Sequence, residues 1–91
     1  MDVLIIYNRD EQRSEAIIDD EIIGVCEYEI MDNKWAITHT FVDERFKGQG
    51  IAKKLVIKIV EESRINGVKI IPICSYAKKM LEGNEEYKDA L

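Results

Sequence analysis

Four apolar runs, separated by polar turns, fill the first half of the chain. β-Branched and aromatic residues are frequent in these runs, which is typical of strands. Tight turns join consecutive strands most simply in antiparallel order. We therefore expect an antiparallel sheet with the first run at its edge and the second and third runs as a hairpin. The predicted strands cover residues 3–7, 14–18, 22–30 and 35–42.

The apolar period changes to that of a helix after Gly50, with apolar residues on one face and charged residues on the other. Asn66-Gly67 can end this helix in a left-handed conformation. The next run is almost continuously apolar, which is typical of an interior strand, although Pro72 cannot donate to a sheet ladder. These elements predict a β-α-β unit with any ligand crevice at the carboxyl ends of its strands. Its parts are strand 35–42, helix 50–66 and strand 68–73.

The carboxyl-terminal segment predicts short helical pieces. Ser75 is a suitable N-cap for a helix over residues 77–81, Gly83 can end that helix, and a last turn follows over residues 84–87. The whole pattern is that of an α+β fold. A length of 91 residues with 46% hydrophobic content suits one domain, residues 1–91.

The composition excludes several classes of partner. Thirteen basic and 18 acidic residues give a formal net charge of -5, which argues against nucleic acid as the main partner. No apolar run is long enough to span a membrane and the amino end carries no basic leader, so we expect a cytoplasmic protein that does not engage membranes. The cysteines lack the ligand spacing of zinc sites, so we expect reduced thiols and no metal.

The glycine-rich stretch before the long helix is a candidate anion site. The first N–H groups of a helix lack intrahelical partners and carry the positive end of the helix dipole, and glycines let a phosphate approach the backbone closely. Lys47 adds a positive charge beside Gly48 and Gly50. The Walker and dinucleotide phosphate motifs are absent. On the glycines alone, an ordinary turn that leads into a helix is an equal alternative.

Three residues could carry nucleophilic or acid–base chemistry. Cys26 lies in the middle of a predicted strand, where a buried and inert thiol is expected. Cys74 follows a strand, precedes a helix and faces the same crevice as the glycines, a setting that favours a reactive thiolate; a small apolar plug is the alternative. His39, the only histidine, stands just before the glycine stretch and is either a catalytic base or a structural or surface residue.

Four motifs, taken in order, resemble those of the GNAT acyltransferases. Arg45-x-x-Gly48-x-Gly50 is similar to the acetyl-CoA pyrophosphate loop of that superfamily. The resemblance extends over nearly the whole chain to minimal, single-domain GNAT-like N-acetyltransferases of the YjdJ type, although relatives often have His-Pro-Glu-Tyr where this chain has residues 84–87. It implies a truncated GNAT fold, with antiparallel strands followed by a β-α-β unit and short carboxyl-terminal helices. The further motifs are His39-Thr40-x-Val42, Pro72-x-Cys74-Ser75-Tyr76 and Glu86-Tyr87.

The resemblance also implies a cosubstrate and a binding site for it. Acetyl-CoA would be the cosubstrate, without a metal, and the acceptor would be an unidentified amine. A full GNAT enzyme has an amino-terminal helical segment that builds the acceptor site, and this chain lacks one, so the pocket would be open to a protein or peptide amine. The residues implied to contact acetyl-CoA are Phe41, Val42, Lys47, Gly48, Gln49, Gly50, Ile51, Ala52, Ser75 and Tyr76.

Two mechanisms and one non-enzymatic function remain open. In direct attack by the amine, His39 and either Tyr76 or Tyr87 would be the base and the acid; in double displacement, Cys74 would be the nucleophile and His39 its base. The alternative function is a non-catalytic acyl-CoA-binding or interaction module, because a fold does not guarantee a chemistry. In either case we expect a monomer or a weak dimer.

Overall fold

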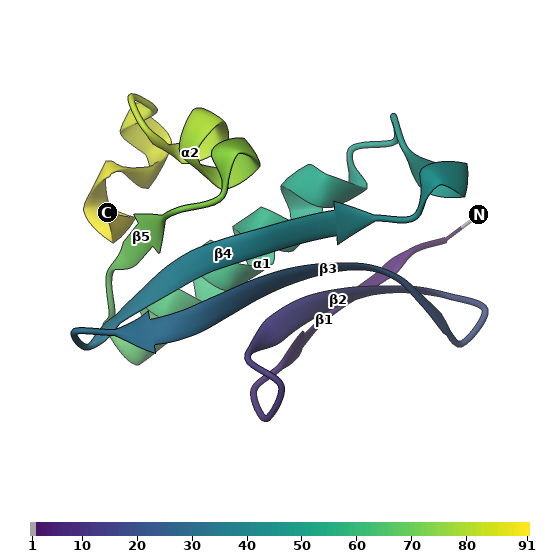
Figure 1. Cartoon of the computed structure of the whole chain (residues 1–91), viewed down its shortest axis with the longest axis horizontal. Coiled ribbons are helices and arrows are strands. Elements are labelled where there is room, and N and C mark those ends of the chain that lie inside the picture. The colour runs from purple at the N-terminus through teal and green to yellow at the C-terminus, as the bar shows by residue number, and fades with distance from the viewer. Residues whose placement is uncertain (1) are drawn as a thin grey trace.

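The computed structural model describes residues 2–91 and contains a five-stranded sheet whose strand order follows the chain, β1-β2-β3-β4-β5 (Figure 1). The first four strands are antiparallel, as predicted, and β1 lies at one edge. β5 pairs in parallel with β4. The α+β prediction is therefore confirmed. The strands are β1 (Leu4–Asn8), β2 (Arg13–Ile18), β3 (Glu21–Met31), β4 (Lys34–Val42) and β5 (Ile70–Pro72).

The hairpin turns have residues that tolerate the left-handed backbone. Asp19 and Asp20 join β2 to β3 with φ angles of 49° and 65°, and Asp32 and Asn33 join β3 to β4 with φ angles of 52° and 62°. Two consecutive residues with positive φ match the right-handed twist of the flanking strands. Aspartate and asparagine adopt this conformation more readily than other residues with a side chain. The local sequence thus favours both hairpin turns, and the strand register then shifts once in each hairpin, between Ala16 and Ile17 and between Glu27 and Tyr28.

One long helix, α1 (Ile51–Asn66), packs against one face of the sheet and lies behind the strands in Figure 1. Its apolar stripe is buried, and the Ser14 hydroxyl donates to the carbonyl of Leu55 at 2.8 Å. A Cβ atom at Gly24 would lie 3.2 Å from Leu55 Cδ1, so this glycine lets the helix approach the sheet closely. As predicted, the helix ends at Gly67 with a φ of 67°.

The prediction of an interior strand over residues 68–73 is wrong. Only Ile70–Pro72 is a strand, and it lies at the edge of the sheet. A proline is tolerated there because an edge strand leaves one side of its backbone unpaired. The amides of Ile73 and Cys74 both donate to the carbonyl of Ile37, at 3.0 and 2.9 Å, so the chain leaves the sheet directly after Pro72. The residues after β5 are thereby held beside the middle of β4.

The next helix, α2 (Ser75–Leu81), starts earlier than predicted, and its N-cap is Cys74 instead of Ser75. The Cys74 Sγ accepts a hydrogen bond from the amide of Ala77 at 3.4 Å. Ser75 already has its place in the first helical turn, so it cannot be the cap. The predicted last turn is also longer, because it forms a 3-10 helix, η2 (Glu85–Ala90). Gly83, with a φ of 77°, separates the two helices.

Arg64 fastens η2 to the long helix. Its guanidinium donates to the carboxylate of Asp89 and to the carbonyl of Glu86, both at 2.8 Å. This ion pair lowers the pKa of Asp89 and raises that of Arg64. The Arg64 guanidinium also lies over the ring of Tyr87, which is buried. The carboxyl-terminal segment is therefore tied to the end of α1 that is remote from the glycine stretch.

Candidate functional site

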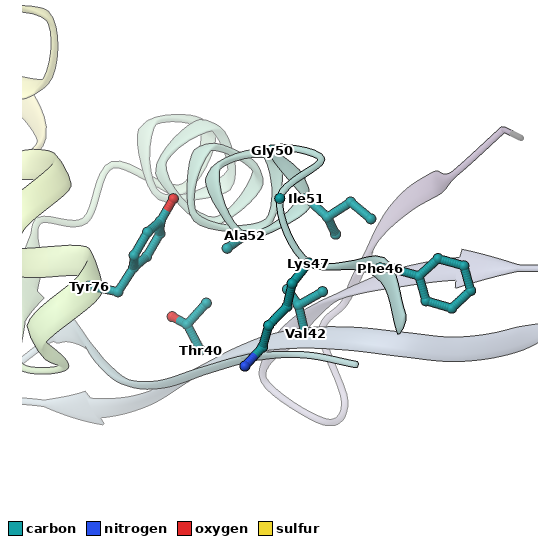
Figure 2. Close-up of a pocket in the computed structure, with 9 residues that line it drawn as sticks. Thr40, Val42, Phe46, Lys47, Gly50, Ile51, Ala52 and Tyr76 are labelled. Atoms are coloured by element: carbon teal, nitrogen blue, oxygen red, sulfur yellow. The ribbon is translucent and has the colours of Figure 1, made fainter. Parts of the chain in front are cut away.

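A cavity of about 460 Å³ opens between the end of β4, the glycine stretch and the first turns of α1 and α2 (Figure 2). Its position agrees with the crevice predicted at the carboxyl ends of the β-α-β strands. Figure 2 shows the Tyr76 hydroxyl directed toward the start of α1, and the Phe46 ring directed away from the other side chains. The cavity is lined by Thr40, Val42, Phe46, Lys47, Gly48, Gly50, Ile51, Ala52 and Tyr76.

The glycine stretch leaves open space where side chains would otherwise lie. Gly48 and Gly50 have φ angles of 82° and 76°, and a Cβ atom added at either would meet nothing within 4 Å. Most residues are strained in this left-handed conformation, whereas glycine adopts it freely. The two glycines therefore turn the chain into α1 and keep its first amides accessible.

Within residues 2–91, α1 is the only helical segment that starts without a side-chain cap. Its N-cap, Gly50, provides no side-chain hydrogen bond, and its first turn contains no acidic residue. The other helical segments are capped by the side chains of Asp43, Cys74 and Asn84. Unpaired amides at the positive end of a helix dipole bind anions such as phosphate. The first turn of α1 is therefore suited to an anion at the cavity.

Arg45 anchors the glycine stretch to the sheet. Its guanidinium forms ion pairs with Asp43 at 2.9 Å and Glu21 at 3.0 Å, and lies over the ring of Phe46. These hydrogen bonds lower the pKa of Asp43 to about 2 and raise that of Arg45. Lys47, in contrast, lines the cavity and forms only an exposed ion pair, with Glu44 at 2.9 Å. Of these two cations, Lys47 is the one placed for an anionic ligand.

Two cysteine sulfurs flank one hydroxyl beside the cavity. Thr40 Oγ1 lies 3.4 Å from Cys74 Sγ and donates to Cys26 Sγ at 3.7 Å. Cys26 is fully buried, as predicted, and burial raises the pKa of its thiol to about 12. Cys74 is only half-buried. The two thiols therefore differ in access although they share the same neighbour.

The structure does not bring His39 or Phe41 to this cavity. Side chains alternate between the two faces of a strand, and both residues are exposed while their neighbours Thr40 and Val42 face α1. His39 lies opposite Glu27 of β3. To act as the base for Cys74, His39 would have to contact the thiol. Its place on the other face of the sheet does not allow this contact.

The remaining predicted residues divide between the cavity and its surroundings. Tyr76 lines the cavity, and partial burial raises the pKa of its phenol. Gln49 and Ser75 are exposed and are not among the lining residues. Tyr87 lies in η2 under Arg64, away from the cavity. The hydroxyl groups near the site come from Thr40 and Tyr76.

Sequence reasoning missed Thr40 and Phe46 as lining residues. Thr40 belongs to the His39-Thr40-x-Val42 motif, and the alternation of side chains along a strand places it on the same face as Val42. That signal could have selected it. Phe46 lies in a 3-10 turn, η1 (Glu44–Phe46), which has no comparable periodic signal.

Within residues 2–91, no group of three or more histidine, cysteine, aspartate or glutamate side chains is arranged to hold a metal ion. Over the same range, no helix combines the length and the apolar character that crossing a membrane requires.

The chain is similar to known proteins over most of its length. The sequence profile of the family described as GCN5-related N-acetyl-transferase matches residues 13–90. The solution NMR structure of a GCN5-like candidate N-acetyltransferase from Staphylococcus aureus matches with a TM-score of 0.74 and 35% identity, covering 96% of this chain and 85% of that one. The comparison with curated proteins yields no match.

A more distant structure shares the fold. The ribosomal-protein-alanine N-acetyltransferase from Brucella melitensis biovar Abortus 2308 matches with a TM-score of 0.62 at 16% identity, and the matched region covers 77% of this chain but 58% of that enzyme. The profile match, the identity to the Staphylococcus aureus protein and the shared fold agree with one another. The chain therefore belongs to the GCN5-related N-acetyltransferase family.

Proposed function

We propose that this protein binds acetyl-CoA in the cavity beside β4 and transfers the acetyl group to an amine. The observation that carries the proposal is the start of α1, which has no side-chain cap, no acidic residue in its first turn and open space at two glycines, and which lines a cavity of about 460 Å³. An anion bound there would meet unpaired amides and the charge of Lys47. Family membership supports CoA as the source of that anion.

The cavity orients the proposed ligand. The pyrophosphate would lie over the amides from Gly48 to Ala52, with Lys47 beside it. The acyl end would then point along β4 toward Thr40, which contacts the thiol of Cys74. Val42 and Tyr76 would contact the apolar arm of the ligand between these two ends. Gln49 and Ser75 remain proposed contacts at the outer margin of the site.

The proposed chemistry is double displacement through Cys74. Its thiolate attacks the acetyl carbonyl, the new bond joins the carbonyl carbon to Sγ, and the bond to the CoA sulfur breaks with its electron pair on that sulfur. CoA leaves and takes a proton from water. The acceptor amine then attacks the acetyl-cysteine, the bond to Sγ breaks to restore the thiolate, and one proton of the attacking nitrogen passes to solvent, which leaves the neutral amide. Atoms and charge balance in both steps.

Direct attack by the amine is the rival mechanism. It needs a base near the acetyl carbonyl, and the proposed base, His39, lies on the opposite face of the sheet. Tyr76 is the only acid–base side chain near the acyl end among the lining residues that the structure describes. We therefore propose double displacement: Cys74 is not itself a lining residue, but its Sγ lies 3.4 Å from the hydroxyl of Thr40, which lines the cavity. The acceptor is proposed to be an amine on a protein or peptide.

A binding experiment tests the site. Gly50→Val places a branched side chain in the open space beside the proposed pyrophosphate, and we expect the affinity for CoA to fall at least about tenfold, equal to about 1.4 kcal/mol. Gly83→Val is a matched control, because Gly83 has a similar φ of 77° and equally open surroundings but does not line the cavity. Titration calorimetry on both folded variants separates the loss of the site from backbone strain. Equal affinities would remove the glycine stretch from the site.

A second experiment tests the transfer. The protein is incubated with acetyl-CoA, and intact mass and peptide mapping follow the gain of one acetyl group at Cys74 while free CoA thiol is measured in parallel. Acetyl-cysteine and its disappearance on addition of an amine would support double displacement. Binding of CoA without acetyl-cysteine or released thiol would instead favour a non-catalytic acyl-CoA-binding module. That second candidate is favoured by one observation, the absence of histidine and carboxylate side chains among the described lining residues.

A further inference from the structure

Among the described residues that line the cavity, Thr40 alone has a hydrogen bond to Cys74. We infer that Thr40 is a positioning residue for Cys74: its hydroxyl turns from Cys26 to Cys74 when Cys74 loses its proton, and so stabilises the reactive thiolate. This inference rests on the proposed role of Cys74 as nucleophile. It concerns a residue that sequence reasoning did not select.

The distances leave the hydroxyl a choice between two acceptors. Thr40 Oγ1 lies 3.4 Å from Cys74 Sγ and 3.7 Å from Cys26 Sγ, and a hydroxyl has a single proton to donate. While both thiols are neutral, the two sulfurs are similar weak acceptors. Once one sulfur is charged, a hydrogen bond to it is roughly twice as strong as a neutral one. The hydroxyl proton therefore follows the charge.

Burial determines which sulfur becomes charged. Cys26 has no exposed surface, whereas Cys74 is half-buried at the start of α2. Burial in an apolar environment disfavours a thiolate, and the raised pKa of Cys26 reflects this effect. Cys26 therefore remains a neutral partner at physiological pH. The charge, when it forms, belongs to Cys74.

A second donor completes the environment of the Cys74 sulfur. The amide of Ala77 donates to Sγ at 3.4 Å from the first turn of α2. Thr40 is held by β4 and Ala77 by α2, so the two donors reach the sulfur from separate elements. A group that is prearranged to stabilise charge need not reorganise when the charge develops. Cys74 is thus cap and candidate nucleophile at once.

Other titratable groups near Cys74 are few. Cys26 of β3 lies across Thr40, and Tyr76 follows Cys74 by two residues on α2. No charged side chain within residues 2–91 forms a hydrogen bond or ion pair with the sulfur. The hydroxyl of Thr40 is therefore the side-chain donor whose removal should change the thiolate population most directly.

The test is the pH dependence of Cys74 alkylation, followed by peptide mapping after short pulses of iodoacetamide. Thr40→Val keeps the size of the side chain and removes the hydroxyl, while Thr40→Ser keeps the hydroxyl. Because hydrogen bonds to charged groups are stronger than neutral ones, we expect Thr40→Val to slow labelling at pH 7 about tenfold and to move the midpoint of the profile up by about one pH unit. Thr40→Ser should restore the wild-type profile.

Controls separate this role from packing. Thr38→Val removes a hydroxyl from the same strand at a half-buried position without a hydrogen bond to either sulfur, and should leave the profile unchanged. Labelling of the buried Cys26 indicates that a variant has unfolded. If Thr40→Val does so, Thr40→Ala provides a second hydroxyl-free variant. An unchanged midpoint in a folded hydroxyl-free variant, or a wild-type Cys74 that does not label below the pH of unfolding, overturns the inference.

The alkylation assay does not need acetyl-CoA, so the two proposals can fail separately. A hydroxyl-dependent shift without formation of acetyl-cysteine would retain the role of Thr40 and reject double displacement. Acetyl-cysteine that forms equally well in wild type and Thr40→Val, with superimposable alkylation profiles, would retain double displacement and reject the role of Thr40.

Discussion

The two faces of the sheet differ in what covers them, although the same strands form both. On the covered face, α1 buries an apolar layer and leaves the cavity at its own first turn, so that Thr40 and Val42 of β4 line a site. On the open face, the neighbouring His39 and Phe41 of the same strand are exposed. Residues adjacent in sequence can therefore belong to unrelated environments. The side of the sheet that the helix crosses determines which of them can meet a ligand.

The open face is not simply polar. The apolar residues Leu4, Ile22 and Phe41 are 58%, 47% and 52% exposed to solvent. Across this face the buried carboxylate of Glu15 is held by Arg13 at 2.8 Å. On the covered face, Leu55 and Ile59 have no exposed surface. Since hydrophobic stabilisation scales with the apolar area removed from water, the covered face should account for most of the folding free energy.

The largest expected effect is on the free energy of unfolding. It is measured by truncating two leucines, one packed against the covered face and one on the open face. Leu55→Ala removes a fully buried side chain between helix and sheet, and we expect the free energy of unfolding to fall by about 3 kcal/mol because both burial and packing are lost. Leu4→Ala, at 58% exposure on the open face, should cost less than about 1 kcal/mol. Urea unfolding of both variants measures the difference. Equal losses would mean that the two faces contribute alike.

The two thiols extend the comparison of buried and accessible positions to chemical reactivity. Burial raises the pKa of the Cys26 thiol to about 12, so at pH 7 only about one Cys26 side chain in 10⁵ is a thiolate. We therefore expect Cys74 to react with iodoacetamide at least about a hundredfold faster than Cys26. Saturating CoA should slow labelling of Cys74 and leave Cys26 unaffected. Comparable rates at the two cysteines in the folded protein would contradict the assigned difference in access.

The smallest effect is expected at His39. Because its side chain lies on the face opposite to the cavity, His39→Gln should change the rate of acetyl transfer less than about twofold. If His39 were the general base of either mechanism, its loss would cost about 10²–10⁴-fold. Steady-state kinetics with a model amine distinguish these outcomes. A large loss would show that the sheet or α2 rearranges when acetyl-CoA binds.

The sequence by itself determined the elements whose causes are local. The alternation of apolar residues predicted the antiparallel strands, the change of period predicted α1, and the paired Asp and Asn residues in the turns are compatible with the observed hairpins. Gly48, Gly50 and Gly67 are glycines because the backbone there is left-handed. The family resemblance, which the comparisons confirm, also came from motifs within short stretches of sequence.

Only the tertiary structure decided the features that depend on residues far apart in the chain. A strand pattern shows that Thr40 and His39 lie on opposite faces, but not which face α1 covers. The apolar composition of residues 68–73 could not reveal that β5 lies at the edge, because that depends on whether another strand pairs beyond it. Cys74 is a cap and a neighbour of Thr40 because Ile37 holds the chain after Pro72. Each of these outcomes comes from packing and hydrogen bonding between distant segments, which no local pattern contains.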